Sequence, residues 1–457
     1  AELARRRNTL RALQEAIEAA VMGESNSAKA ALSRDLCRPG SETIFEMSAP
    51  LAAIDLLLAN LSRWAEPERH STPALAWPAT SRVVREPVGG VLVISPWNFP
   101  LALSFQYAAS AIAAGNAVCV KPSELAPAAA QLVATVVRVV AEATGWPMVC
   151  CLGDASVSTK LLDAGPWGTI AFTGSPRVGR IIAAAAANSL TPVVLELGGK
   201  CPVIVCEDAD IKTAARRILW TKVLNAGQIC ISCNYVIVVG DAAQGMLIAE
   251  LKAAAREFFY PTLPDDACAD DKLALMKSST SLGRIVSVEH AQRLAKLLKA
   301  TSGQVIIGGE TAPEDRYVSP TVVDLGTAVD DPLLSEEIFG PILPILTAQS
   351  LDEALALARE ISVDPLALYA FTRSAEARER ILAGTRSGGV SFNHVLMHCA
   401  NEGLPFGGCG GNSGIGKLHG ETGFLAFTHR RAVMTCSTAI EANLMYPPYT
   451  EGKERIV

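Results

Sequence analysis

An alternation of short apolar runs with helical segments constrains the fold of this chain more than any other feature of its sequence. From Gly89 onward the runs are rich in β-branched residues, and segments with the apolar spacing of helices separate them. Such alternation predicts parallel sheets with crossover helices. We expect two α/β domains, with a ligand site at the C-terminal strand ends in the cleft between them. The predicted strands are 90–95, 116–120, 148–152, 169–173 and 193–197 in a first set, and 235–239, 304–307, 342–346, 368–371 and 389–392 in a second set.

The segment before the first of these strands has a different character. Apolar residues recur at helical spacing from Leu10 to Val21 and predict an amphipathic helix, and a second helix is expected to begin near Ser41. Residues 66–80 are rich in proline and turn formers and lead into an exposed strand at 81–88. No long linker or internal repeat separates the two strand sets, so we expect a tight domain interface.

Composition narrows the class of protein and its compartment. Half of the 457 residues are hydrophobic, 19% are charged and the net charge is −6, which fits a globular protein and gives no argument for nucleic acid or an anionic membrane. Twelve cysteines are too sparse for a disulfide scaffold, so we expect reduced thiols and a cytoplasmic location, with a removed N-terminal leader left open. The charge-free run between Glu86 and Lys121 contains prolines and amides, so we expect a strand, loop, helix and strand there. The polar C-terminal tail carries no hydrophobic anchor, and we expect a soluble protein.

Three residues are candidates for catalysis. Cys230 precedes the predicted strand 235–239, and a thiol on a loop held by a rigid strand can serve as a nucleophile. Glu196 ends a strand at a Gly-Gly turn, and Asn98 lies between two prolines, where its amide could donate to an oxyanion. A buried inert thiol and a turn-capping asparagine are the alternatives.

Three further stretches could bind a nucleotide. Residues 172–179 run from a strand into a helix N-terminus, which suits a phosphate, although the chain contains no strict GxGxxG and no nucleotide-hydrolase loop. Lys121, Ser123 and Glu124 follow another strand and could reach ribose hydroxyls, or form a solvated loop. Residues 336–341 offer a carboxylate and an aromatic ring, or simply a helix-terminal charge and a core phenylalanine.

The spacing of Cys230 and Cys233 leaves two other readings open. It matches half of a zinc site or a redox pair, but no second CxxC follows and the nearby histidines lack the usual spacing, so we expect no metal. A disulfide between the two cysteines would silence a catalytic thiol, and we hypothesise redox sensitivity, which the rate of Cys230 labelling after mild oxidation would test. No Gly-x-Ser-x-Gly elbow indicates a serine hydrolase.

Taken together and in this order, these stretches resemble the aldehyde dehydrogenase superfamily over nearly the whole chain. The short N-terminus and the stretches REPVGGVLVISPWNFPL, FNHVLMH and GLPFGG look like its class 3, or fatty-aldehyde, branch. The stretches that carry the resemblance are PWNFP (96–100), KPSE (121–124), FTGSPRVG (172–179), LELGGK (195–200), NAGQIC (225–230), EEIFGP (336–341), and LPFGG (404–408) with NSGIG (412–416).

The resemblance implies a role for each matching position. Cys230 would add to the aldehyde carbonyl, Asn98 would hold the oxyanion, and Glu196 would activate the water that hydrolyses the thioester. The cofactor would be NAD or NADP, with NAD favoured because Glu124 would repel a 2′-phosphate. The substrate would be a medium- or long-chain aliphatic or an aromatic aldehyde. The implied cofactor contacts are Ser95, Pro96, Trp97, Lys121, Ser123, Glu124, Gly174, Ser175, Gly179, Leu197, Gly198, Glu337 and Phe339.

The resemblance also implies the domain organisation. A Rossmann-like cofactor domain would comprise residues 1–65, 89–198 and 405–420, and an α/β catalytic domain would comprise 199–404. A small β arm of residues 66–88 and 421–457 would serve oligomerisation, with a homodimer expected. The chain departs from the family pattern by one extra glycine within 407–414, which puts the local backbone near the substrate mouth in question.

Two rival functions remain at this point. An acylating dehydrogenase would pass the thioester to coenzyme A, although Glu196 argues against it because a water-activating base would compete with the thiol. A catalytically silent member would bind cofactor without turnover, although the joint presence of Cys230, Glu196 and Asn98 argues against that.

Overall fold

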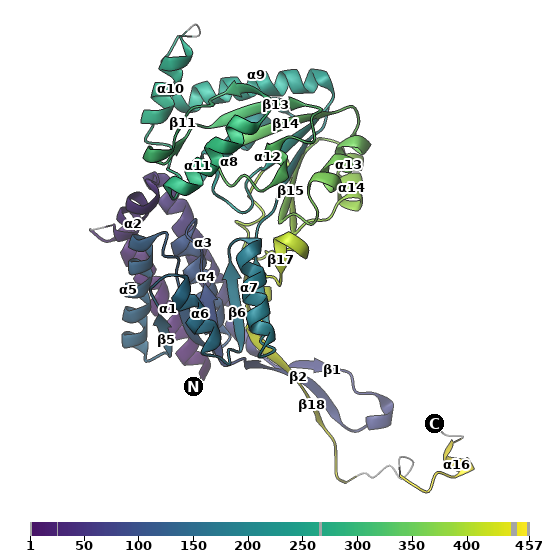
Figure 1. The fold of residues 1–457 in the computed structure, drawn as a ribbon. Helices are drawn as coiled ribbons and strands as arrows, with labels where there is room; N and C mark the ends of the chain where they lie inside the picture. The colour runs from purple at the N-terminus through teal and green to yellow at the C-terminus, as the bar shows by residue number, and fades with distance from the viewer. Residues whose placement is uncertain (1, 25, 265–266, 440–445, 455–457) are drawn as a thin grey trace.

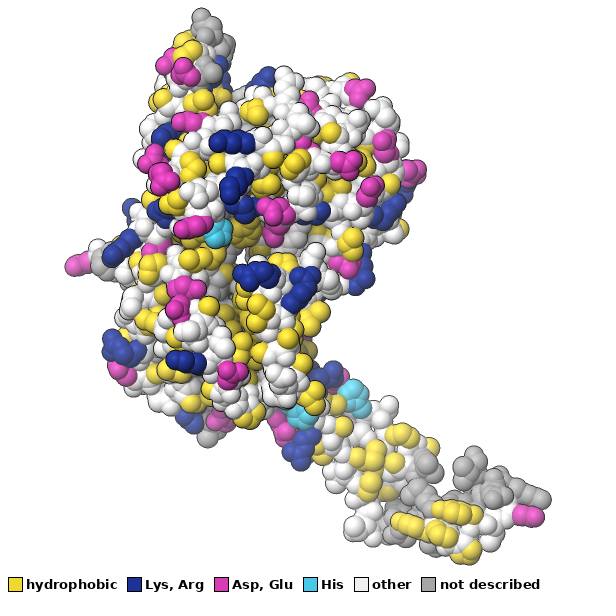
Figure 2. Space-filling view, in the orientation of Figure 1, with side chains coloured by type: hydrophobic (Ala, Val, Ile, Leu, Met, Phe, Trp, Pro, Cys, Tyr) yellow, Lys and Arg dark blue, Asp and Glu magenta, His cyan; other side chains and the backbone are white. Residues whose placement is uncertain are grey.

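Two α/β lobes and a projecting β arm make up the molecule (Figure 1). The computed structural model describes all residues except 1, 25, 265–266, 440–445 and 455–457. The surface is hollowed between the two lobes (Figure 2).

The lower lobe in Figure 1 is built on a six-stranded sheet with strand order β17-β7-β6-β3-β4-β5. Its strands are parallel except β17, which pairs antiparallel with β7 at the edge. The strands are β3 (Gly90–Ile94), β4 (Ala117–Lys121), β5 (Met148–Cys150), β6 (Thr169–Thr173), β7 (Val193–Glu196) and β17 (Gly414–Ile415). The helices are α1 (Glu2–Met22), α2 (Ser27–Leu36), α3 (Gly40–Ala65), α4 (Pro100–Ala113), α5 (Pro127–Thr144), α6 (Ala155–Asp163), α7 (Pro176–Ala187) and α15 (Gly420–Ala426).

Successive residues of the strands in this sheet serve two separate cores. Val91 and Val93 of β3 pack with the layer that contains α1, α3, α4 and α5. Leu92 and Ile94 point to the other face, where Ile182 of α7 covers them. Because side chains alternate along a strand, a sheet covered on both faces needs the near-continuous apolar runs seen in the sequence.

The upper lobe contains a seven-stranded sheet with strand order β10-β13-β14-β9-β8-β15-β16. All neighbours are parallel except β10, which pairs antiparallel with β13. The strands are β8 (Pro202–Val205), β9 (Tyr235–Val239), β10 (Gln304–Ile307), β13 (Thr321–Gly326), β14 (Ile342–Ala348), β15 (Ala367–Phe371) and β16 (Gly389–Phe392), with a separate pair β11 (Thr311–Ala312) and β12 (Tyr317–Val318). The helices are α8 (Ile211–Val223), α9 (Asp241–Phe259), α10 (Ala269–Ser278), α11 (Val288–Ala300), α12 (Pro332–Ser335), α13 (Leu351–Ile361) and α14 (Ala375–Gly384).

A three-stranded antiparallel sheet forms the arm. Its order is β1 (Glu68–His70), β2 (Thr80–Pro87) and β18 (Thr428–Thr435), so residues far apart in the sequence pair along its length. Hydrophobic side chains gather at its far end (Figure 2), where Trp77 and Met434 are exposed. The short helix α16 (Glu451–Glu454) lies beyond β18.

The predicted α/β class and both strand sets are confirmed, with three differences. The second set was expected to be parallel, but β10 is antiparallel because the short β11–β12 region reverses the chain before β13. The strands β8 and β13 were not predicted; β8 starts at a proline, which a strand accommodates at its first residue. The helix α2 was also missed, and left-handed residues, Asn26 and Cys37, flank it.

The charge-free run 87–120 forms the end of β2, then β3, α4 and most of β4, as expected. Among the described residues, α3 is the helix long and apolar enough to cross a membrane by length and composition. It buries Met47, Ile54 and Leu57 in the core shared with α1 and α4, and a core helix passes the same test.

Candidate active site

The loop that carries Cys230 begins with small residues in a strained backbone conformation. Asn225, Ala226 and Gly227 have φ of 49°, 50° and 72°, three left-handed residues in a row. A Cβ at Gly227 would lie 2.4 Å from the carbonyl oxygen of Gly340. The loop therefore needs a glycine at this position, and the strain is held by the surrounding hydrogen bonds.

Two amide side chains fix the loop. Asn225 Nδ2 donates to the carbonyl of Asn98 at 2.9 Å and to that of Gln228 at 3.1 Å. Gln228 Nε2 donates to Asn225 O at 2.9 Å, and its Oε1 accepts from Val286 N at 2.9 Å. All the groups that hold the loop are buried, so Cys230 is presented from a pre-organised backbone.

Glu196 faces the Cys230 thiol. Cys230 Sγ lies 4.0 Å from Glu196 Oε1, at the C-terminal end of β7. Burial raises the pKa of Glu196 to about 7, while hydrogen bonds from Tyr107 and Thr173 lower it. Burial and then the Glu196 charge raise the pKa of Cys230 well above its usual value. The pair thus combines a neutral thiol with a carboxylate that can exchange a proton near neutral pH.

The residues that hold the other oxygen of Glu196 were not predicted. Tyr107 Oη donates to Glu196 Oε2, and Thr173 Oγ1 donates to the same oxygen at 3.3 Å. Tyr107 lies inside α4, which is buried all round, so its apolar neighbours give no periodic signal that would single it out. Thr173 lies within the stretch 172–179 but was assigned no role.

Asn98 lies just before α4 and is 4% exposed. Its Nδ2 donates to Gln228 O at 3.1 Å, and the second proton of the amide is left for another acceptor. The backbone carbonyl of Asn98 accepts a hydrogen bond from Arg38 Nη2. The structure therefore brings Asn98, Cys230 and Glu196 into one region through the loop at 225–228.

A buried ionic group beneath Asn98 was also missed. Arg38 pairs with Glu42 at 3.8 Å and with Glu46, and Glu46 Oε1 accepts from the N–H groups of Leu101 and Ala102 at 2.9 and 3.2 Å. Glu46 thus satisfies the first turn of α4. No local pattern indicates this, because the three charged residues and α4 are distant in sequence.

The residues expected at the nicotinamide end meet across the cleft. The Trp97 ring is T-shaped to the Phe339 ring, with centroids 5.4 Å apart. A Cβ at Gly198, the residue after Leu197, would lie 2.4 Å from Glu337 Oε2, so Glu337 reaches the end of β7. Burial raises the pKa of Glu337 to about 8. These residues come from both lobes and lie beside the Cys230 and Glu196 pair, since Glu337 also acts on the Cys230 pKa.

The remaining cofactor candidates follow β4 and β6. Lys121 Nζ pairs with Glu124 Oε2 at 2.7 Å. Ser175 caps α7 by accepting from Val178 N at 3.4 Å, and a Cβ at Gly179 would lie 2.7 Å from Leu197 Cδ2, so α7 packs closely on the sheet. Gly174 stands between β6 and this cap. A helix start after β6 and a lysine and a carboxylate after β4, with β3 between the two strands, fit the phosphates and ribose of a dinucleotide.

Ser95 and Ser123, two of the residues predicted to contact the cofactor, use their hydroxyls in hydrogen bonds within the protein. Ser95 Oγ hydrogen-bonds Ser104 Oγ at 2.6 Å, and Ser123 Oγ accepts from Leu125 N at 3.2 Å as a turn cap. Pro96 is buried between β3 and α4. For Ser95 and Ser123 the hydroxyl is thus engaged within the protein.

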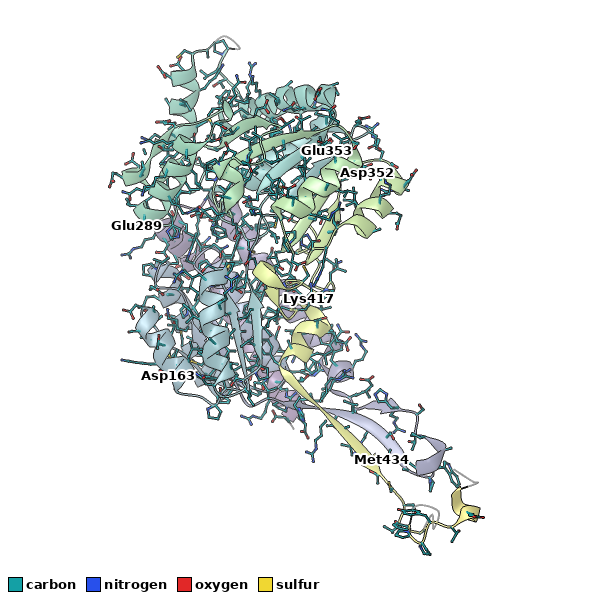
Figure 3. The ribbon with its side chains drawn as sticks, turned by 45° about the vertical axis from the view of Figure 1, so that its right-hand side comes forward. Asp163, Glu289, Asp352, Glu353, Lys417 and Met434 are labelled. Carbon is teal, nitrogen blue, oxygen red and sulfur yellow. The ribbon has the colours of Figure 1, made fainter. Side chains whose placement is uncertain are left out.

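The glycine-rich loop after Phe406 reaches the catalytic strand. Gly414 of β17 pairs with Glu196 of β7, and a Cβ at Gly414 would lie 1.9 Å from Leu195 O. Lys417 Nζ donates to Gly388 O at 2.9 Å and Gly407 O at 2.6 Å, at the junction between the lobes (Figure 3). The loop with the extra glycine therefore supports the backbone of Glu196.

The cysteines of the CxxC pair are free thiols in different surroundings. Cys230 is partly exposed, whereas Cys233 is fully buried and burial raises its pKa to about 11. Within the described residues, no group of three histidine, cysteine or acidic side chains could hold a metal ion. The hypothesis of oxidation between Cys230 and Cys233 stays a hypothesis.

A thiol, a carboxylate with a pKa of about 7 and an amide thus meet between two α/β lobes, and the lower lobe has a parallel sheet of the kind that binds dinucleotides. Residues 1–433 match the Aldehyde dehydrogenase family, and the chain belongs to this family. Its activity is the NAD(P)-dependent oxidation of aldehydes to carboxylic acids. The expected family, fold class and enzyme class are confirmed.

Relatives and solved structures agree over most of the chain. "Aldehyde dehydrogenase family 3 member H1" of Arabidopsis thaliana is 40% identical over 94% of this chain and 85% of its own. "4,4'-diaponeurosporen-aldehyde dehydrogenase" of Staphylococcus aureus is 38% identical over 90% of this chain and 85% of its own. The solved "Substrate bound state of Staphylococcus Aureus AldH" has a TM-score of 0.90 at 36% identity, covering 99% of this chain and 94% of that one.

Proposed function

We propose that Cys230 is the nucleophile, Glu196 the base and Asn98 the oxyanion donor of this aldehyde oxidation. The observation that carries the proposal is the 4.0 Å contact between Cys230 Sγ and Glu196 Oε1 beneath a loop fixed to Asn98. Glu196 is the carboxylate in contact with the thiol, and its pKa of about 7 lets it accept a proton and later return one.

The steps follow from these positions. Glu196 takes the thiol proton, and the Cys230 sulfur forms a C–S bond to the aldehyde carbon. The carbonyl oxygen becomes an oxyanion, to which the free N–H of Asn98 donates. Glu196 releases the thiol proton to solvent, and after oxidation it deprotonates the water that attacks the thioester carbon. The C–S bond then breaks, the thiolate takes the proton back from Glu196, and the carboxylic acid leaves. A base beside the thioester favours water over coenzyme A as acceptor.

The nicotinamide cofactor, when bound, supplies the acceptor for the two electrons and the hydrogen of the aldehyde. Lys121, Glu124 and the start of α7 would hold its adenosine and pyrophosphate end, and Trp97, Glu337 and Phe339 its nicotinamide end. We propose NAD as the preferred form, because the Glu124 carboxylate would repel a 2′-phosphate. The names of solved neighbours state both cofactors, NAD for a protein of Sinorhizobium meliloti and NADP for one of Methanocaldococcus jannaschii, so the preference rests on Glu124.

The proposed substrates are medium- or long-chain aliphatic or aromatic aldehydes. Support comes from the name of the Staphylococcus aureus relative, "4,4'-diaponeurosporen-aldehyde dehydrogenase", which states an aldehyde as its substrate. The proposed cofactor domain is 1–65, 89–198 and 405–420, the catalytic domain is 199–404, and the arm is 66–88 with 421–457. We propose a homodimer through the arm, supported by the open strand edge of β18, and a cytoplasmic location, supported by twelve free cysteines.

A panel of aldehydes assayed by nicotinamide absorbance tests the reaction, with NAD and NADP each supplied in turn. The Cys230→Ser variant is the active-site control, and Cys268→Ser, which changes an exposed cysteine, is its match. We expect activity to be lost only in Cys230→Ser and to rise with apolar chain length. Equal activity of Cys230→Ser and the wild type would contradict the proposal, and turnover that requires coenzyme A would favour the acylating rival.

A further inference from the structure

Among the described residues, three side chains have hydrogen-bond contacts with the carboxylate of Glu196. One oxygen, Oε1, faces Cys230 Sγ at 4.0 Å. The other, Oε2, accepts from Tyr107 Oη and from Thr173 Oγ1, and these two hydroxyls lie 2.5 Å apart. Tyr107, Thr173 and Glu196 are at most 4% exposed. The two oxygens of one carboxylate thus have separate tasks.

We infer that Tyr107 is a positioning residue, which holds Glu196 by Oε2 and so aims Oε1 at the Cys230 sulfur and at the water that cleaves the thioester. Tyr107 lies on α4, the helix whose start is anchored by Glu46 and preceded by Asn98. One helix therefore sets both the base and the oxyanion donor. This inference rests on the proposed role of Glu196.

Tyr107 restricts the rotation of the buried Glu196 carboxylate. Without the phenol, Oε2 would keep only the 3.3 Å contact with Thr173, which is long for an O–H donor. Thr173 also comes from β6, the neighbour of β7, so it moves with the same sheet. Tyr107 comes from a different layer and supplies the second point of attachment that fixes the carboxylate plane.

Tyr107 also acts on the charge of Glu196. Its hydrogen bond favours the carboxylate form and is the larger of the two contributions that lower the Glu196 pKa against burial. The other titratable groups near Glu196 are Cys230 on the catalytic loop and Cys399 on the loop after β16. On the remaining side β17 pairs through its backbone, at Gly414 and Ile415, and adds no charge. In the part of the chain that the structure describes, no basic side chain is among the causes of the Glu196 pKa shift, and the Tyr107 phenol is the first of the two hydrogen-bond donors that lower it.

The test measures hydrolysis of the acyl-enzyme separately from its formation. With p-nitrophenyl acetate as acyl donor, Cys230 forms a thioester and releases nitrophenolate in a burst, and the following slow phase is hydrolysis of the C–S bond by water. The variant Tyr107→Phe removes only the hydroxyl. Tyr235→Phe is the matched control, since it removes a buried hydroxyl that bonds Ser362 and belongs to β9, in the sheet of the other lobe.

We expect Tyr107→Phe to move the midpoint of the pH–rate profile of the slow phase upward by about one unit, with hydrolysis about tenfold slower below the midpoint. Tyr235→Phe should leave the midpoint in place. An unchanged midpoint in Tyr107→Phe, or an equal shift in both variants, would overturn the inference. Replacing Tyr107 with 3-fluorotyrosine keeps the shape and strengthens the donor, so the midpoint should move downward; an upward move or none would also overturn it.

Glu196→Gln in the same assay distinguishes this inference from the proposal beneath it. If Glu196→Gln hydrolyses the acyl-enzyme as fast as the wild type, the role of Glu196 is wrong and the inference falls with it. If Glu196→Gln is slow while Tyr107→Phe keeps the wild-type rate and midpoint, the role of Glu196 stands and Tyr107 has no part in it.

Discussion

At the scale of single residues, the site divides into groups that react and groups that hold them. Cys230, Glu196 and Asn98 were candidates from the sequence, because each lies in a stretch that carries the family resemblance and has small, stiff or strand-forming neighbours, and their roles stay a proposal. Tyr107, and the contacts that Arg38 and Glu46 make with residues 98–102, could not be predicted, because only the packing of α4 on α3 and on the sheet brings these distant segments together.

Removing the Asn98 amide should lower kcat/KM with little loss of stability. We expect Asn98→Ala to reduce kcat/KM by about 10²–10³, the usual effect of losing one oxyanion donor. The matched control is Asn60→Ala, whose amide bonds Leu56 O within α3. Steady-state kinetics and thermal melts of both variants would check this, and a loss of activity that only follows the loss of Tm would contradict it.

Exchanging Glu124 for glutamine should change the choice of cofactor. The carboxylate pairs with Lys121, and without it the lysine is free for a 2′-phosphate. We expect Glu124→Gln to lower the ratio of kcat/KM for NAD to that for NADP at least tenfold. Glu142→Gln, an exposed partner of Arg138 on α5, should leave the ratio unchanged. An increase of the ratio in Glu124→Gln would show that Glu124 does not face the 2′ position.

At the scale of elements, the strand pattern determined most of the fold, but it missed the interior strands β8 and β13, the direction of the edge strand β10 and the pairing of the edge strand β17. The strands β6, β9 and β16 match their predicted ranges. Of these, β6 and β9 are fully buried runs, which have few alternatives, whereas β16 is half-buried. The pairing of β17 with β7 is carried by backbone groups and glycines, so it leaves no apolar pattern. The antiparallel run of β10 depends on the connection to β13 rather than on its own residues.

The β17–β7 pairing should be needed for activity. Gly414 has φ of 97°, and a Cβ there would clash with Leu195 O, so Gly414→Ala should displace β17 and the backbone of Glu196. We expect at least a tenfold loss of kcat and a lower Tm. Gly245→Ala on α9, where a Cβ meets open space, should be active and more stable by about 0.5–1 kcal/mol. Full activity of Gly414→Ala would show that β17 does not support the site.

At the scale of the whole molecule, the two lobes meet at a cleft and the arm projects away from them. The cleft brings Glu337 and Phe339 of the upper lobe against Trp97 and Gly198 of the lower lobe. A cleft between the two strand sets could be predicted from the sequence. The individual contacts across it could not, since they depend on loops of irregular length.

A single arm residue should control assembly. Met434 is 51% exposed on the edge strand β18, in the arm shown in Figure 3. We expect the wild type to be a dimer by light scattering and Met434→Asp to shift it toward monomer, because a charge on an apolar contact must lose its water. Met22→Asp, at the exposed end of α1, is the control and should not change the mass. A monomeric wild type would refute the dimer.

The protonation of Glu196 should make the protein less stable as pH rises. Its folded-state pKa of about 7 lies above the ordinary value of 4.5, so the folded protein retains a proton that the unfolded chain has lost between these values. The free energy of unfolding therefore falls from pH 4.5 to 7 and stays low above. Relative to the wild type, Glu196→Gln should gain up to about 3 kcal/mol between pH 5 and pH 8 in urea titrations. A difference that is independent of pH would show that Glu196 is not shifted.

The most direct test of the account is the time course of NADH formation after rapid mixing of enzyme, NAD and an aldehyde. The account predicts that Glu196→Gln forms at most about one NADH per subunit, more slowly than the wild type because the Cys230 thiol has lost its proton acceptor, and then nearly stops because the thioester waits for water. Cys230→Ser should form none. If Glu196→Gln turned over at the wild-type rate, or if Cys230→Ser produced NADH, the assignment of nucleophile and base would be wrong.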